Sequence, residues 1–266
     1  MKTLPQAERA VIRKDFREIW DSRMARSTVL IVPLLLVVVL PVALVVMVST
    51  IPESEINGAE KMMELLPKEA RGFNFRQSML YMMTNLMFPA FFLMIPLMAS
   101  SVAAASSFVG EKERGTLQTL LLTPMDMKQI FRAKTLGCVL LSAIVTAISF
   151  VAFAVVISVG DLLLGMPFFL NWSWLVLILF LTPAATVFGV VFMVMTSAKS
   201  KSFIEATQTS AFLVLPLVLA LIGQMAGLFR ISALFLLLAA AVVAAADGLL
   251  FAFAGRSFTP EKLLRS

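Results

Sequence analysis

The sequence lacks histidine, and it contains one cysteine, one tyrosine and few charged residues. Without histidine, the chain can form neither a histidine-ligated metal site nor a histidine general base. The single cysteine, Cys138, excludes a disulfide within the chain. Charged residues make up 14% and hydrophobic residues 60% of the 266 positions, whereas soluble domains carry about 25% and roughly 45–50%. This composition indicates a protein with several membrane spans rather than a soluble domain with an anchor.

Six apolar runs are long enough for a helix to cross a bilayer, which takes about 20 residues. They cover residues 28–50, 78–108, 134–159, 173–196, 203–221 and 231–254. The sequence therefore predicts an all-α polytopic membrane protein, with a transmembrane domain over residues 28–254 and a short cytosolic tail at 255–266. The run 78–108 exceeds the bilayer thickness and contains Pro89 and Pro96, so we expect it to kink and to extend beyond the membrane.

Positive charges indicate which side each connecting segment occupies. With both termini in the cytosol, 17 of the 22 Lys and Arg residues fall in cytosolic segments and 5 in outer ones. This asymmetry has the direction of the positive-inside rule. The same topology accounts for the net charge of +6 without a nucleic-acid partner.

The N-terminal segment, residues 1–27, combines basic residues with an apolar helical face. This face contains Ile12, Phe16, Ile19 and Trp20, which follow helical spacing. We expect a cytosolic amphipathic helix that lies in the membrane interface, with Trp20 at the level of the headgroups.

The longest cytosolic segment between two predicted spans covers residues 109–134 and begins with a cluster of charges: Glu111, Lys112, Glu113 and Arg114. Gly115 is expected to end the preceding helix, and Thr116 to cap a new, short helix that stops before Pro124. The new helix has a leucine face made of Leu117, Leu120 and Leu121. This helix is either a knob for the groove of a partner protein or an interfacial helix that rests on lipid headgroups.

Few polar side chains lie within or beside the predicted spans, and four are candidates for a transport path: Asn85, Glu205, Gln208 and Asp247. A carboxylate inside a membrane indicates a function by default. Asp247 lies about two turns from the cytosolic end of the last span, so it either pairs with Lys199 or Lys201 or belongs to the path. No residues resemble a nucleophile–base pair, a metal cluster or a phosphate-binding loop. The sequence therefore predicts no catalytic, cofactor or metal site on this chain.

Three segments carry a resemblance to a known family. Residues 108–134 read FVGEKERGTLQTLLLTPMDMKQIFRAK, residues 14–23 read KDFREIWDSR, and residues 201–208 read KSFIEATQ. In this order they resemble the segment between spans two and three, the connecting helix before span one, and the start of span five in type-2 ABC transporter permeases. The last segment is closest to the sodium- and drug-export branch. Many members of that branch have a much larger outer domain than residues 51–77 provide here.

The resemblance implies a function that the composition does not supply. The chain would be the membrane half of an ATP-driven exporter, in which two permeases, identical or different, pair and each docks a separate ATPase subunit. ATP and Mg would be bound by that ATPase, and the location would be the inner membrane of a bacterium or archaeon. Residues 116–122 would form the coupling helix. The residues at or beside the ATPase would be Glu111, Glu113, Arg114, Gly115, Thr116, Leu117, Leu120 and Leu121.

Two other functions stay open on the sequence. A secondary transporter or channel would show paired half-repeats and charges near the membrane midplane, but the sequence shows no convincing repeat and only Asp247 lies well inside a span. A membrane resistance or immunity factor without an ATPase is the other alternative. The largely apolar interior suits a lipid, a hydrophobic peptide or a drug as the transported substrate.

Overall fold

The computed structural model describes residues 6–50, 72–116, 125–197, 200, 202–225 and 232–257. Regular structure in these residues is entirely helical. Six helical stretches among them are long and apolar enough to cross a membrane, namely Arg23–Thr50, Phe75–Glu113, Gln129–Leu164, Trp172–Ser197, Phe203–Gln224 and Ala233–Phe251. The predicted all-α fold with six spans is confirmed. The predicted leucine face of Leu117, Leu120 and Leu121 lies outside the described residues.

Several spans consist of more than one helical segment. After α1 (Gln6–Asp21), the first span contains α2 (Arg23–Leu34), η1 (Leu35–Val39) and α3 (Leu40–Thr50). The second contains α5 (Phe75–Met82), η4 (Met83–Met87), α6 (Phe88–Ala104), η5 (Ala105–Val109) and α7 (Gly110–Glu113). The third is α9 (Met127–Leu164), and the fourth contains α10 (Trp172–Val176), η6 (Leu177–Leu181) and α11 (Thr182–Ser197). The fifth contains α12 (Phe203–Thr209) and α13 (Ala211–Met225), and the sixth is α14 (Ala233–Ser257).

The segments labelled η are π-helical turns, and three of the four described ones have the same cause. The turns η1, η4 and η6 each end two residues before a proline, namely Pro41, Pro89 and Pro183. A proline inside a helix lacks an N–H group and its ring clashes with the carbonyl of the preceding turn. A wider turn at this place relieves the clash and leaves the helix continuous. The fourth turn, η5, has no such proline after it.

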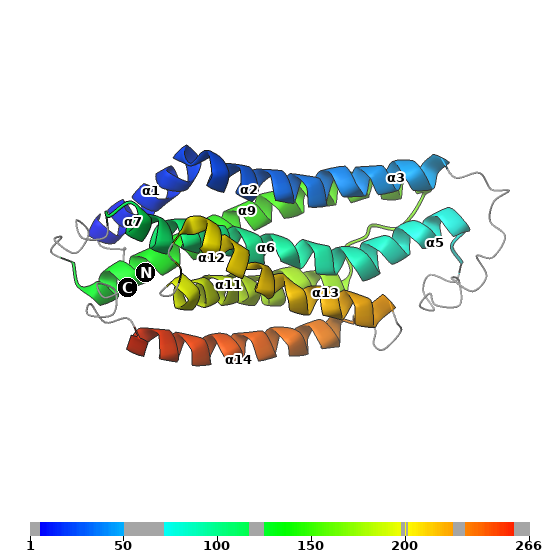
Figure 1. Cartoon of the computed structure of the whole chain (residues 1–266). Helices are drawn as coiled ribbons and strands as arrows, with labels where there is room; N and C mark the ends of the chain where they lie inside the picture. The colour runs from blue at the N-terminus through cyan, green and yellow to red at the C-terminus, as the bar shows by residue number, and fades with distance from the viewer. Residues whose placement is uncertain are drawn as a thin grey trace.

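The second span lies at the centre of the bundle. In its most apolar stretch 72% of the residues are buried, against 17% in the fifth and sixth spans. Small residues allow the close packing, because a Cβ atom on Gly189 of α11 would lie 2.1 Å from Ser100 Oγ of α6. Figure 1 shows α6 between α2 and α11, with α14 at the edge of the bundle. The fold therefore gives the second span contacts with most of the other helices.

The third span extends beyond the predicted residues 134–159 in both directions. It ends at Leu164 because Gly165 adopts a left-handed conformation with φ of +63°, and the N–H of Met166 donates to the carbonyl of Asp161 (2.8 Å). This is a Schellman cap. The chain then folds back on the bundle, where Phe169 is 5% exposed and its N–H donates to Asp161 Oδ2 (2.9 Å).

The N-terminal segment divides into two helices rather than one interfacial helix followed by a span from residue 28. Ser22 caps α2 by accepting a hydrogen bond from the N–H of Ala25 (3.3 Å), so the first span begins at Arg23. The side of α1 that packs on the bundle contains Val11, Asp15 and Ile19, together with Glu8. Trp20, from the predicted apolar face, is 51% exposed. The position of α1 in the membrane interface stays a prediction.

Candidate functional site

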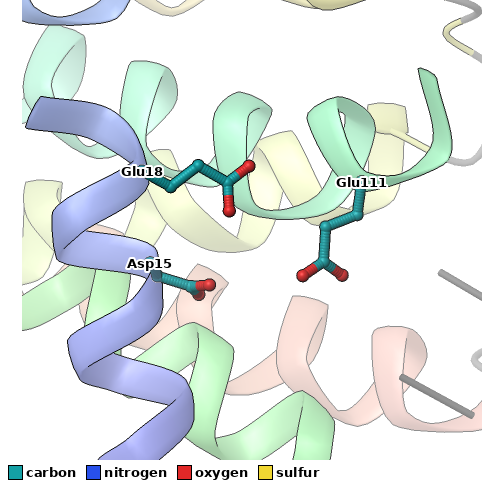
Figure 2. Close-up of side chains that lie close together, drawn as sticks. All are labelled: Asp15, Glu18 and Glu111. Carbon is teal, nitrogen blue, oxygen red and sulfur yellow. The ribbon is translucent and has the colours of Figure 1, made fainter. Parts of the chain in front are cut away.

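A cluster of charged side chains joins α1, α7 and α9 at the end of the bundle that contains α1 and α7. Figure 2 shows Asp15 and Glu18 of α1 and Glu111 of α7 extending into one space between these helices. One carboxylate oxygen of each lies within 4.8 Å of the others. Asp15 and Glu111 are 3% and 1% exposed. Three negative charges at this separation require positive partners.

Lys134 of α9 is the central positive charge of the cluster. Its Nζ lies 2.9 Å from Glu111 Oε2 and 3.8 Å from Asp15 Oδ1, and it donates to the carbonyl of Ser107 (2.6 Å). The ammonium group also lies 5.5 Å from the centre of the Phe108 ring. Oxygen atoms and an aromatic face thus take the place of water around this lysine, which is 2% exposed.

Two further cations complete the cluster from its rim. Lys14 forms ion pairs with Glu111 and, at 3.9 Å, with Glu18. Arg114, just after α7, forms an ion pair with Glu18, and its Nε donates to the carbonyl of Gly110 (3.0 Å). Three acids and three bases thus share the cluster. The carboxylates have the spacing of a metal site, but protein cations already neutralise them, so the structure supports an ion-pair network.

Burial raises the pKa of Asp15 above its ordinary value of 3.8, and the positive charge of Lys134 and the hydrogen bond from Ser107 oppose this rise. The Ser107 hydroxyl donates to Asp15 Oδ2 at 2.6 Å. The charge of Asp15 therefore depends on Lys134, which comes from another span.

The π-helical turn η5 lies inside this cluster and contains Ser107. A wide turn frees backbone carbonyls from the regular helical pattern, and the Ser107 carbonyl accepts the hydrogen bond from Lys134. No proline stands two residues after η5, in contrast to the other three π-helical turns. Instead, Ser107 of η5 forms hydrogen bonds with Lys134 and Asp15. Such turns are frequent at functional sites.

The structure places the described residues of the predicted ATPase-contact segment in three settings. Glu111 and Arg114 belong to the charge cluster. Glu113 is exposed, and its Oε2 accepts from the N–H of Phe203 at the start of α12 (3.0 Å). Gly115 has φ of +68°, and the N–H of Thr116 donates to the carbonyl of Glu111 (3.0 Å), which forms a second Schellman cap. The predicted helix end at Gly115 is confirmed, whereas Leu117, Leu120 and Leu121 lie outside the described residues.

The four candidate path residues lie in separate settings. Asn85 in η4 accepts a hydrogen bond from Asn171 Nδ2, and Asn171 caps α10. Glu205 and Gln208 are exposed on α12, which lies toward the opposite end of the bundle from α5 (Figure 1). Asp247 in α14 is 8% exposed, and its Oδ1 has no hydrogen-bond partner among the described residues. The predicted partners Lys199 and Lys201 lie outside the described residues.

Sequence reasoning did not identify Asp15, Glu18, Ser107 or Lys134 as site residues. One signal was available, because Asp15 stands four residues from both Val11 and Ile19 and therefore shares their face of α1. A carboxylate on the packed face of a helix needs a partner from another element.

Comparison with known proteins agrees with this architecture. The family model described as "ABC-2 family transporter protein" matches residues 9–241. A search of curated proteins finds no match to this chain. The family match covers the charge cluster, the first five spans and the sixth span up to residue 241. It is to the family as a whole rather than to a sodium- or drug-export branch. The chain is thus a multi-pass membrane protein that belongs to the ABC-2 family, the transmembrane permease subunits of ABC transporters.

Proposed function

We propose that this chain is the permease subunit of an ATP-driven exporter. It forms the substrate path as a dimer with a second permease and is coupled to a separate ATPase subunit, which holds ATP and Mg. The coupling contact is made by residues 116–122, with Glu111, Glu113 and Arg114 beside it. The chain itself carries no catalytic step.

The observation that carries this proposal is the charge cluster next to the coupling segment. Arg114 stands two residues before Thr116 and is ion-paired with Glu18 of α1. Glu111 is ion-paired with Lys134 of α9, and Glu113 binds the first turn of α12. A force applied at residues 116–122 would therefore reach α1 and the third and fifth spans as well as the second.

The second span is suited to carry such a movement farther. It contacts several other helices, and its π turns η4 and η5 stand near its two ends. Closure of the ATPase pair would move the coupling segment, and the buried second span would transfer that movement to the substrate path. Turns with irregular hydrogen bonding are places where a helix bends with little loss of packing.

The test is co-purification from the native membrane with a tag on the permease. We expect a stoichiometric ATPase subunit with the natural sequence and its loss with Leu120→Asp/Leu121→Asp, because two carboxylates cannot enter an apolar groove unpaired. The matched control is Leu162→Asp/Leu163→Asp, the same change at two leucines that are 82% and 68% exposed at the other end of α9.

The control variant should retain the ATPase, and both variants should remain monodisperse in size-exclusion chromatography. Retention of the ATPase by the Leu120/Leu121 variant, or equal loss in both variants, would contradict the proposed docking contact.

A further inference from the structure

A groove of about 640 Å³ lies between α1, the first span and the third span. Its volume falls within the range of about 300–1,000 Å³ that ligand pockets have. The charge cluster faces a different side of α1, because Lys14, Asp15 and Glu18 do not line the groove. The groove is therefore a feature separate from the proposed coupling contact.

Each of the three helices presents one continuous face to the groove. On α2 and η1 the lining residues are Val29, Leu30, Pro33, Leu34, Val37 and Val38, and on α9 they include Leu141, Ile144, Val145 and Ile148. Both sets follow steps of three and one, which keep side chains on one side of a helix. Leu34 and Ile148 are 56% and 66% exposed. Two membrane spans thus provide apolar walls that are open at the side.

The face contributed by α1 has a different chemistry. It contains Arg13 and Arg17, one turn apart, with Phe16 and Trp20 between and beyond them, and Asp21 at its end. Among the described residues, neither arginine forms an ion pair. Asp21 offsets one of the two positive charges, so the mouth of the groove keeps a net positive charge. An exposed tryptophan beside arginines is typical of the headgroup level of a membrane.

We propose that this groove binds an anionic glycerophospholipid from the leaflet on the α1 side. One acyl chain lies between the first and third spans, and the headgroup phosphate is held by Arg13 and Arg17. Guanidinium groups bind phosphate oxygens in pairs of parallel hydrogen bonds. A helix from a second permease would have to bring its own acidic groups to this depth, whereas a phospholipid combines an apolar chain and an adjacent phosphate in one molecule.

The bound lipid would stabilise the position of α1 against the first and third spans. The helix turns sharply into α2 at Ser22 and packs on α9, where Ile12 approaches Gly137. A lipid bound on the other side of the junction between α1 and α2 would contact α1, the first span and the third span at the same time. The inference goes beyond the proposed export function, because it concerns a lipid that binds whether or not an ATPase is attached.

The experiment uses the full chain in detergent, titrated with phosphatidylglycerol or phosphatidylcholine and followed by native mass spectrometry. Basic residues near a membrane surface favour the binding of anionic lipids. We therefore expect phosphatidylglycerol to bind roughly tenfold more tightly than phosphatidylcholine. The preference should disappear in Arg13→Gln/Arg17→Gln. It should persist in Arg9→Gln/Arg23→Gln, which removes the same charge from two exposed arginines outside the groove.

A phosphatidylglycerol with a photoreactive acyl chain locates the site. Cross-links should map to residues 29–38 and 141–152, and Ile148→Trp, which fills the groove and keeps both arginines, should remove them. An unchanged lipid preference in Arg13→Gln/Arg17→Gln, equal loss in the control, or cross-links elsewhere would overturn the proposal. Recovery of a second copy of the chain at residues 141–152, in place of the lipid, would also overturn it.

Discussion

Buried charges occur in two contrasting regions of this membrane protein. Near α1, three carboxylates and three cations from α1, the end of the second span and α9 form one network. In α14, Asp247 is also buried, at 8% exposure, but its Oδ1 has no partner among the described residues. Among the residues that the structure describes, the first region thus pairs its charges, and the second leaves this carboxylate oxygen without a partner.

This contrast separates two reasons for placing charge in an apolar protein. In the cluster, partners from distant parts of the chain meet, such as Lys14 and Glu111, which are 97 positions apart, so the charges fix how these elements are arranged. A single carboxylate in a span fixes no such arrangement, and it is retained against a cost in free energy. We therefore assign a positioning role to the cluster, and for Asp247 a role in the transport path stays a proposal.

The largest expected effect in this comparison comes from Lys134→Met. Removing one partner of a buried ion pair typically costs about 3–5 kcal/mol, because the remaining charges are left uncompensated. We expect a clear fall in the melting temperature of the detergent-solubilised protein, measured by intrinsic fluorescence. Lys14→Met, which removes a lysine whose side chain is 45% exposed, should cause a much smaller fall.

The penalty of Lys134→Met should also depend on pH. Burial already raises the pKa of Asp15 and Lys134 opposes this, so the variant should have a still higher Asp15 pKa. A carboxyl group with a raised pKa destabilises the folded state as pH increases from the ordinary pKa of that group, 3.8 for Asp15, through its folded pKa. The loss in melting temperature should therefore be smaller at pH 5 than at pH 7.5. A loss of equal size at both values would contradict the role given to Asp15.

A smaller effect on stability is expected from Asp247→Asn. The substitution removes a buried charge without breaking an ion pair among the described residues, so the melting temperature should stay the same or rise slightly. Asp161→Asn is the matched comparison, because Asp161 is also buried in a span but accepts a hydrogen bond from Phe169. A fall for Asp247→Asn that equals or exceeds the fall for Asp161→Asn would show that Asp247 has a structural partner.

Much of the fold was predictable because hydrophobic length alone identifies a membrane span. The helix ends were predicted less accurately. An apolar run marks only the part of a helix that lies in the hydrocarbon of the membrane, whereas the backbone hydrogen bonds of the helix continue beyond that part. The second span was predicted over 78–108 and is Phe75–Glu113. The C-terminal end of this span could nevertheless be predicted from Gly115, which ends the helix as expected. The left-handed Gly165 ends the third span by the same mechanism.

The candidate site was predictable only in its local part. The charged run from Glu111 to Arg114 is visible in the sequence, but its partners depend on tertiary packing. Ser107 and Asp15 are 92 residues apart, and Asn85 and Asn171 are 86 apart, so no periodic pattern connects them. Helical spacing did not show which side of α1 packs on the bundle, because the predicted apolar face was assigned to the membrane interface, and the packed side contains a carboxylate, Asp15.

We propose that the coupling segment acts on the spans through the neighbouring ion pair between Arg114 and Glu18 of α1. The most direct measurement is ATP hydrolysis by the reconstituted permease–ATPase complex with Glu18→Arg, Arg114→Glu and the two changes combined. Each single change places like charges together and should lower hydrolysis severalfold, and the charge-swapped double variant should recover at least half of the natural rate. Unchanged rates in the single variants, or a double variant as slow as the slower single one, would contradict the account.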